Sequence, residues 1–414
     1  MNYAFTWVFL CALLATTVTR LWLALRQARH VRAHRDEVPA SFAGEIPLPA
    51  HQKAADYTVA KVKLGVADLA VDIVVLLALT LGGLLQLLAG QWERVFTADS
   101  LLHGTALILS VFLIQGVAGM PLSLYGTFVI EERFGFNKMT LRLYLLDMLK
   151  STALAAALGI PFLLVVLWLM QAAGELWWLY VWIAIVGYSI FLQFIGPRFI
   201  MPVFNKFSPI EDPALVERVQ RLLDRCGYRS RGLYVMDGSK RSAHGNAFFS
   251  GFGATKRIVL FDTLIDRLQP AEVEAVLAHE LGHFKLRHIV KGMLIGWATT
   301  LSLLFALGFL VNKSWFYAGL GVETPSLAAA LVLFLLVTPV FLYFIQPLTK
   351  LFSRKNEFEA DAFATKHANA EDLVHALVKL YRDNASTLTP DPLHSAFYDS
   401  HPPAATRIAR LRTA

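Results

Sequence analysis

The chain has 414 residues, of which 56% are hydrophobic and 17% are charged, and its formal net charge is +7. Soluble globular domains contain roughly 25% charged and 45–50% apolar residues, so this composition disfavours an ordinary soluble enzyme and a disordered chain. The two cysteines, Cys11 and Cys226, lie far apart, which argues against a disulfide framework and a thiolate metal site. In so apolar a chain, an excess of Lys and Arg favours basic loops beside a membrane over a nucleic-acid-binding surface.

Seven apolar segments are long enough to cross a bilayer, which takes about 20 residues of helix. In chain order, the predicted spans are residues 4–25, 64–89, 101–130, 152–170, 176–195, 289–311 and 326–347. The third span contains Pro121, so we expect it to tilt or kink. No basic residue precedes the first span, which therefore differs from a cleavable signal peptide.

Lys and Arg are distributed unevenly over the short loops between these spans. One side carries eleven of them: Arg26, Arg29, Arg32, Arg35, Lys53, Lys61, Lys63, Arg133, Lys138, Arg142 and Lys150. The opposite side carries only Arg94 and Lys313. Because Lys and Arg are enriched in cytoplasmic loops, this asymmetry predicts an N-terminus outside the cytoplasm and a C-terminus inside it.

Two stretches are polar enough to fold in water, and by the span count both lie on the cytoplasmic side. They are residues 196–288 and 348–414, and we predict that they form one domain. The sixth and seventh spans, within residues 289–347, divide this domain, and the first five spans with their loops occupy residues 1–195. In the first stretch we predict helices at 213–226 and 270–288 and strands at 232–236, 246–249 and 257–261. The predicted fold class is a mainly α, polytopic membrane protein with seven transmembrane helices and a split α+β domain on the cytoplasmic face.

The strongest motif is His279-Glu280-Leu281-Gly282-His283, in the second of these predicted helices. His279 and His283 are four residues apart and project from one helix face, where two imidazoles can bind one metal ion. Glu280 lies close enough to accept a proton from water at that metal and to pass it to a leaving amine. The alternative interpretation is a pair of surface histidines on a polar helix.

Zinc hydrolases use three protein ligands and leave a fourth position for water. We expect the third ligand to be Glu357, in Asn356-Glu357-Phe358-Glu359-Ala360-Asp361. Asp361 follows it by about one helical turn and can accept the outer N–H of a ligand histidine. Glu359 is the rival ligand but should point elsewhere on the helix. An acidic, solvated helix face is the alternative for the whole segment.

Together these residues resemble the type 1 CAAX prenyl protease family, whose members are integral-membrane zinc endopeptidases of the gluzincin type. The resemblance is densest in residues 238–251, 257–263, 277–283 and 357–363, and it continues in residues 400–403 with Arg407. Residues 128–137 resemble a further family signature. Heat-shock-type membrane metalloproteases have fewer spans, and site-2 type proteases carry their zinc motif inside an apolar span, so both fit less well.

The resemblance implies a gluzincin-like protease domain that binds one zinc ion through His279, His283 and Glu357. Glu280 would be the general base, and Asp361 would be the hydrogen-bonding partner behind a ligand.

The same resemblance implies roles for three residues outside the zinc motif. His401 and Arg407 would stabilise the developing oxyanion, and Arg407 would also bind substrate. Asn246 would hold the substrate backbone in an extended, sheet-like conformation.

The implied activity is hydrolysis of peptide bonds, with prenylated proteins cleaved near their C-termini. The expected partners are a peptide or protein substrate, prenylated or otherwise membrane-associated, and the lipid bilayer, with no nucleic acid. We expect a bacterial inner membrane with the active site facing the cytoplasm, because residues 410–414 contain no ER-retrieval signal; the ER membrane is the alternative. The alternative function is a metal-binding membrane transporter or sensor without peptidase activity.

Overall fold

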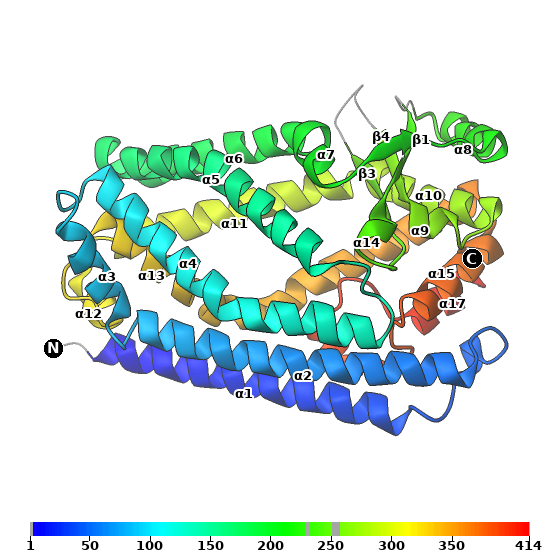
Figure 1. Cartoon of the computed structure of the whole chain (residues 1–414), viewed down its shortest axis with the longest axis horizontal. Coiled ribbons are helices and arrows are strands. Elements are labelled where there is room, and N and C mark those ends of the chain that lie inside the picture. The colour runs from blue at the N-terminus through cyan, green and yellow to red at the C-terminus, as the bar shows by residue number, and fades with distance from the viewer. Residues whose placement is uncertain (1–2, 229–231, 251–256, 414) are drawn as a thin grey trace.

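Long helices run side by side along most of the molecule, and a small sheet with shorter helices lies at one end (Figure 1). This computed structural model describes residues 3–228, 232–250 and 257–413. Both the long helices and the sheet region draw on segments far apart in the sequence. α1 (Ala4–Ala33) packs against α2 (Leu48–Leu79) and also against α13 (Leu327–Leu342) and α16 (Pro392–Tyr398) from the last quarter of the chain.

Six helices among the described residues are long and apolar enough to cross a membrane, and one bent pair makes a seventh unit. In chain order, the units are α1 (Ala4–Ala33); α2 (Leu48–Leu79) with α3 (Leu84–Glu93); α4 (Leu101–Tyr125) with the π-helical turn η2 (Gly126–Glu131); α5 (Leu141–Ala172); α6 (Trp177–Ile195) with α7 (Met201–Phe204); α11 (His288–Leu310); and α13 (Leu327–Leu342) with α14 (Gln346–His367). A short helix, α12 (Ser314–Ala318), lies between the last two units. The predicted count of seven spans agrees with these units when the bent pair of α2 and α3 is taken as one span.

The second span is bent rather than straight. α2 and α3 meet at an angle of 52°, whereas the apolar run predicts a continuous span over residues 64–89. The Thr80 hydroxyl donates to the Leu76 carbonyl at 2.7 Å and closes the last turn of α2. Gly83 then adopts a φ of +74°, a left-handed conformation that glycine adopts without the steric strain of a side chain. Hydrophobicity therefore predicts where this span lies but not its change of direction.

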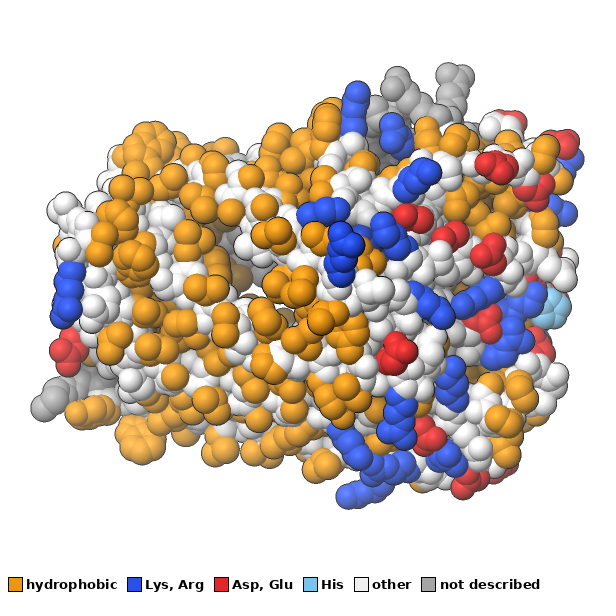
Figure 2. Space-filling model, viewed as in Figure 1, with side chains coloured by type: hydrophobic (Ala, Val, Ile, Leu, Met, Phe, Trp, Pro, Cys, Tyr) orange, Lys and Arg blue, Asp and Glu red, His pale blue; other side chains and the backbone are white. Residues whose placement is uncertain are grey.

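The molecule has two contrasting surfaces (Figure 2). Hydrophobic side chains cover the half built from long helices, and charged side chains gather over the half that contains the sheet. Large apolar side chains such as Trp7, Phe112 and Phe305 are more than half exposed on the long helices. Soluble monomers rarely expose contiguous apolar patches of this kind. The half built from long helices therefore has the surface of a membrane-embedded domain.

A cavity of about 820 Å³ lies among α1, α2, α4 and α13 in the apolar half. Most of its lining is apolar, but Arg20, Asp72 and Gln115 also line it. Polar groups on membrane-spanning helices are costly in lipid and are usually found facing a protein interior or a cavity. The cavity explains how these three side chains are accommodated on apolar helices.

The polar half contains a four-stranded sheet in the order β1–β2–β4–β3. Its strands are β1 (Phe207–Pro209), β2 (Leu233–Met236), β3 (Ala247–Ser250) and β4 (Arg257–Phe261). β2 and β4 are parallel, and the two outer pairs are antiparallel. The three predicted strands are confirmed to within one residue at each end. β1 was not predicted, because three residues are too few to show the alternation that identifies a strand.

Helices surround this sheet and share one hydrophobic cluster. They are α8 (Pro213–Arg225), α9 (Asp262–Ile265), α10 (Pro270–Lys285), α15 (Ala370–Asp383) and α17 (Ala404–Leu411). α16 (Pro392–Tyr398) packs against α14 and α1 instead. The cluster joins Leu222 of α8 and Leu277 of α10 to Leu377 of α15 and Ile408 of α17. The two polar stretches of sequence therefore pack against each other, although two membrane helices separate them in the chain.

The ends of α8 and α10 follow from their capping residues. Asp212 caps α8, because its Oδ1 accepts the backbone N–H of Ala214 at 2.9 Å. α10 begins with a capping box in which Glu272 accepts the backbone N–H of Gln269 at 2.7 Å. It ends at Lys285 rather than at the predicted residue 288, because Arg287 has a left-handed φ of +58°. The chain then starts α11 in a new direction at His288.

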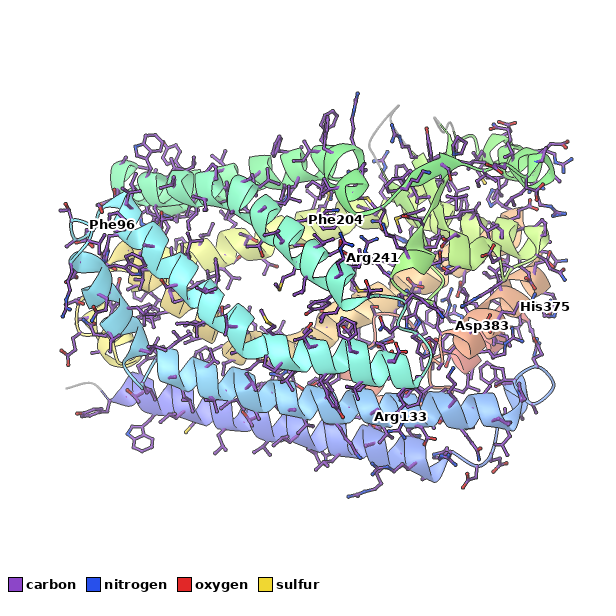
Figure 3. All side chains as sticks on the ribbon, viewed as in Figure 1. Phe96, Arg133, Phe204, Arg241, His375 and Asp383 are labelled. Carbon is purple, nitrogen blue, oxygen red and sulfur yellow. The ribbon has the colours of Figure 1, made fainter. Side chains whose placement is uncertain are left out.

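Arg241 joins the two halves of the molecule. Its Nε donates to Asp147 of α5 at 2.7 Å, and its Nη2 donates to the Phe204 carbonyl at 2.6 Å. In Figure 3, Arg241 and Phe204 lie close together between α5 and the sheet. A half-buried guanidinium with several acceptors fixes the sheet against the membrane helices through charge-assisted hydrogen bonds.

Candidate metal centre

The site is built where α10 crosses α14. Gly282, inside the zinc motif, lies at this crossing, and a Cβ placed on it would be 3.0 Å from Ala360 Cα and 3.1 Å from Phe363 Cβ. Those distances are too short for most side-chain contacts, so the absence of a side chain allows the two helices to approach. The approach brings the motif histidines of α10 opposite the acidic residues of α14.

The three predicted ligands come together at this crossing. One ligand atom each from His279, His283 and Glu357 lie within 4.8 Å of one another. The two Nε2 atoms are 3.2 Å apart. His279 Nε2 lies 3.5 Å from Glu357 Oε2, and His283 Nε2 lies 3.2 Å from Glu357 Oε1. Bonds of about 2.0–2.1 Å to a tetrahedral zinc ion place neighbouring ligand atoms about 3.3–3.4 Å apart, so the three fit such an ion.

The chemistry of these atoms also fits a bound cation. Glu357 is 4% exposed, and its Oε2 is buried without a hydrogen-bond partner among the described residues. Leaving a buried acceptor unsatisfied costs about 1–3 kcal/mol. Two imidazole nitrogens with one carboxylate form a ligand set used by zinc hydrolases. A zinc ion would satisfy all three side chains together.

Asp361 and Arg407 lie directly behind His279. His279 Nδ1 is 2.9 Å from Asp361 Oδ1, a distance suited to donation from the ring N–H to the carboxylate. Arg407 donates to both oxygens of Asp361, at 2.9 and 2.6 Å, and its Nη1 is 3.5 Å from Glu357 Oε2. Burial would lower the pKa of His279, but its contacts with the Asp361 and Glu357 carboxylates outweigh burial and raise it. Arg407 therefore lies among the ligand side chains and is 5% exposed.

Glu280 lies on α10 between the two histidines, partly shielded from solvent. Burial raises the pKa of its carboxyl above the usual range for glutamate. A raised pKa brings the carboxylate closer to the value that suits a general base near neutral pH. This environment is chemically consistent with the predicted role.

His401 and Asn246 occupy more open positions. His401 Nε2 is 3.4 Å from Glu357 Oε1, while 59% of the His401 side chain is exposed. Asn246 is exposed directly before β3, and its Oδ1 accepts the backbone N–H of Ala247 at 2.8 Å. β3 is an outer strand of the sheet, so within the part of the chain that the structure describes one of its edges has no neighbouring strand.

Two of the segments that resemble family signatures, residues 128–137 and 238–251, contact each other. Asn137 and Ser242 form an isolated antiparallel bridge, and the Phe136 carbonyl accepts the Ala243 N–H at 3.0 Å. His244 Nε2 also lies 3.5 Å from Glu131 of η2. Residues 128–137 therefore support the chain that leads into β3. The end of the other signature, Gly251, lies outside the described residues.

Glu359, the rival ligand, points away from the three ligand atoms as predicted. Its Oε2 is 3.0 Å from Nε2 of His288, and His288 Nδ1 is 3.1 Å from His283 Nδ1. His288 has no signal of its own in the sequence, because it follows His283 by five residues and lies beyond the end of α10. Its position depends on the turn at Arg287.

Gly282→Ala is expected to push α10 and α14 apart, lower the stability by about 1–3 kcal/mol and weaken metal binding. The added methyl group would meet the α14 backbone at Ala360, which cannot rotate away. Thermal unfolding and metal affinity of the purified variant test this. Gly292→Ala is the matched control, because a Cβ at Gly292 meets no atom of the described residues within 4 Å. An unchanged metal affinity in Gly282→Ala would contradict the importance of this close approach.

The chain matches known proteins over nearly its whole length. Residues 27–206 match the family described as CAAX prenyl protease N-terminal, five membrane helices, and residues 209–414 match Peptidase family M48. The CAAX prenyl protease 1 homolog of Arabidopsis thaliana is 37% identical over 316 residues, which are 76% of this chain and 74% of that protein. The chain belongs to the CAAX prenyl protease family within peptidase family M48.

Other members of the family show the same similarity. CAAX prenyl protease 1 of Saccharomyces cerevisiae is 38% identical over 311 residues, covering 70% of this chain and 68% of that protein. The human CAAX prenyl protease 1 homolog is 32% identical over 345 residues, covering 74% and 73%. The crystal structure of S. mikatae Ste24p superposes with a TM-score of 0.90 at 30% identity and covers 98% of both chains.

These matches confirm the predicted family and its fold class of membrane helices with a small sheet-containing half. The chain is a membrane-embedded metallopeptidase. The alternative function, a metal-binding transporter or sensor without peptidase activity, is not favoured.

Proposed function

We propose that the chain is an endopeptidase with one zinc ion held by His279, His283 and Glu357. The single observation that carries this proposal is the spacing of their ligand atoms. The two Nε2 atoms are 3.2 Å apart and lie 3.2–3.5 Å from the Glu357 oxygens, of which Oε2 is buried and has no hydrogen-bond partner among the described residues. A zinc ion bound there supplies Lewis-acid chemistry, because it lowers the pKa of water to about 7 and polarises a carbonyl group.

Within this site, Glu280 acts as the general base. It accepts a proton from the attacking water and then gives that proton to the amine that leaves. His401 donates its ring N–H to the oxyanion that develops on the scissile carbonyl, and its exposed position leaves it accessible to a substrate. Arg407 orders Asp361 through two hydrogen bonds and lies within ion-pair distance of Glu357, and its positive charge also favours the developing oxyanion.

We further propose that the substrate lies along β3 as an added strand. The chain that leads into β3 is supported by the contacts of residues 136–137 with residues 242–243, and Asn246 lies directly before the strand. An extended peptide added to a sheet edge gains main-chain hydrogen bonds along its length, and the Asn246 amide offers both a donor and an acceptor.

The substrate is proposed to be prenylated or otherwise membrane-associated. Support comes from the relatives named CAAX prenyl proteases and from the membrane-embedded half that adjoins the site. The proposed location is a bacterial inner membrane, with the ER membrane as the alternative. The uneven loop charges support an N-terminus outside the cytoplasm and an active site facing the cytoplasm. Residues 196–288 and 348–414 are proposed to form one protease domain, with residues 1–195 and 289–347 providing the membrane helices.

A matched pair of peptides tests the substrate class. The purified, zinc-loaded protein is expected to cleave a peptide with a farnesylated cysteine near its C-terminus at least about tenfold more efficiently, in kcat/KM, than the S-methylated peptide. This factor corresponds to about 1.4 kcal/mol, less than burial of two methylene groups of the lipid supplies. Product masses identify the cleaved bond. Equal cleavage of both peptides would contradict the prenyl preference and favour misfolded or other membrane polypeptides as substrates.

A further inference from the structure

His283 and His279 are held from behind in different ways. His279 contacts a carboxylate directly, since its Nδ1 is 2.9 Å from Asp361. His283 instead contacts a second imidazole, since its Nδ1 is 3.1 Å from His288 Nδ1. On the far side of that ring, His288 Nε2 is 3.0 Å from Glu359 Oε2. A continuous chain of hydrogen-bonding atoms therefore runs from His283 through His288 to Glu359.

The chemistry of this chain allows only one direction of donation when both rings are neutral. The Glu359 carboxylate is an acceptor, so the hydrogen of His288 lies on Nε2 and is donated to it. His288 Nδ1 is then an acceptor and receives the hydrogen on His283 Nδ1. This leaves the lone pair of His283 on Nε2, the atom that faces His279 Nε2 at 3.2 Å and Glu357 Oε1 at 3.2 Å. The carboxylate thus selects the ring form that can bind a metal ion.

The surroundings hold His288 in this position. His288 is 5% exposed, so water does not compete freely for its ring nitrogens. It is the first residue of α11, placed there by the left-handed turn at Arg287. Glu359 comes from α14, the helix that also carries Glu357 and Asp361. The ligand His283 is thereby connected, through His288 and Glu359, to the start of α11 and the middle of α14.

We propose that His288 and Glu359 are positioning residues that fix the tautomer and ring orientation of His283 for metal binding. The proposal rests on the proposed zinc function and extends it to residues outside the ligand set. Each histidine ligand is then linked to a carboxylate of α14. Asp361 acts directly on His279, and Glu359 acts on His283 through an intervening imidazole.

Two substitutions of His288 separate hydrogen bonding from packing. The Oδ1 of His288→Asn can occupy the place of the imidazole Nδ1 and accept from His283, although it does not reach Glu359. The terminal amide of His288→Gln occupies the place of Nε2, so it reaches Glu359 but loses His283. We expect His288→Gln to weaken zinc binding about 10–100-fold, the range typical of outer partners of metal ligands. His288→Asn should retain an affinity within severalfold of the wild type.

The readout is the zinc dissociation constant, measured by chelator competition on the purified full-length protein in detergent. The visible spectrum of the cobalt-substituted protein reports the coordination geometry independently of activity. Glu359→Ala, at a position 36% exposed, should weaken zinc binding severalfold without unfolding the protein. Lys355→Ala is its control, because it removes only the surface ion pair with Glu359 at 3.8 Å.

Equal losses of zinc affinity in His288→Asn and His288→Gln would assign His288 a packing role and overturn the proposal. Wild-type affinity in both His288→Gln and Glu359→Ala would overturn it as well. If the wild-type protein binds zinc and these variants bind it with the same affinity, the positioning role alone is refuted. A wild-type protein that binds no zinc refutes the proposed function, and the positioning role with it.

Discussion

Glu280→Gln is expected to reduce kcat/KM for peptide hydrolysis by about 10²–10⁴-fold, the usual contribution of a general acid–base group. The amide has almost the same shape as the carboxylate but does not accept the proton of the attacking water. His279, His283 and Glu357 remain, so zinc content should stay unchanged. Kinetics and metal analysis of the same preparation test both statements, with Glu217→Gln on the exposed face of α8 as control.

The same variant has an expected effect on stability. Burial raises the pKa of Glu280 in the folded, metal-free protein above its value in the unfolded chain. The stability contributed by this group is therefore complete below the unfolded pKa and is lost as the pH rises through the folded pKa. At neutral pH the Glu280→Gln protein should have an equal or higher Tm than wild type when both are metal-free. A clearly lower Tm would contradict the burial of this carboxyl.

Arg407→Ala and Asp361→Ala are each expected to lower the free energy of unfolding by about 3–5 kcal/mol, because each leaves a buried charge without its partner. Arg407 and Asp361 share two hydrogen bonds of 2.9 and 2.6 Å, and each residue is at most 5% exposed. The double variant should be more stable than the sum of the single losses predicts, by about 0.5–3 kcal/mol. Thermal unfolding of the four proteins in one detergent measures this coupling.

Additive losses in that cycle would show that the two side chains act independently. Zinc affinity measured on the same four proteins separates a structural effect from one on the ligand. Loss of Asp361 should weaken zinc binding, because His279 loses the acceptor of its Nδ1 hydrogen. Zinc binding at wild-type strength in Asp361→Ala would contradict the orientation of His279 by this carboxylate.

The membrane helices could be predicted because each is a long apolar run, and length with hydrophobicity identifies such a run without tertiary information. The bend between α2 and α3 could not, because it depends on the left-handed conformation of Gly83, which many glycines do not adopt. The sheet was predicted except for β1, whose three residues pair with β2 only in the folded protein.

The site was predictable to the extent that its residues share one helix. The spacing of His279 and His283 indicates a common face, and Glu357 follows from the need for a third ligand together with the family resemblance. The close packing of α10 on α14 at Gly282 brings them together and is a tertiary event. The contact of His288 with His283 depends on the backbone turn at Arg287, and Arg407 reaches Asp361 from a different helix. Neither contact leaves a periodic pattern in the sequence.

Chelation followed by zinc addition tests the central claim most directly. Wild-type protein in detergent should contain about one zinc ion per chain, as the three proposed ligands require, and should cleave a farnesylated peptide. Removal of the metal should abolish cleavage, and one equivalent of zinc should restore it, whereas the same treatment should leave Glu280→Gln inactive with its zinc bound. Full cleavage by metal-free wild-type protein, or by zinc-loaded Glu280→Gln, would contradict the account.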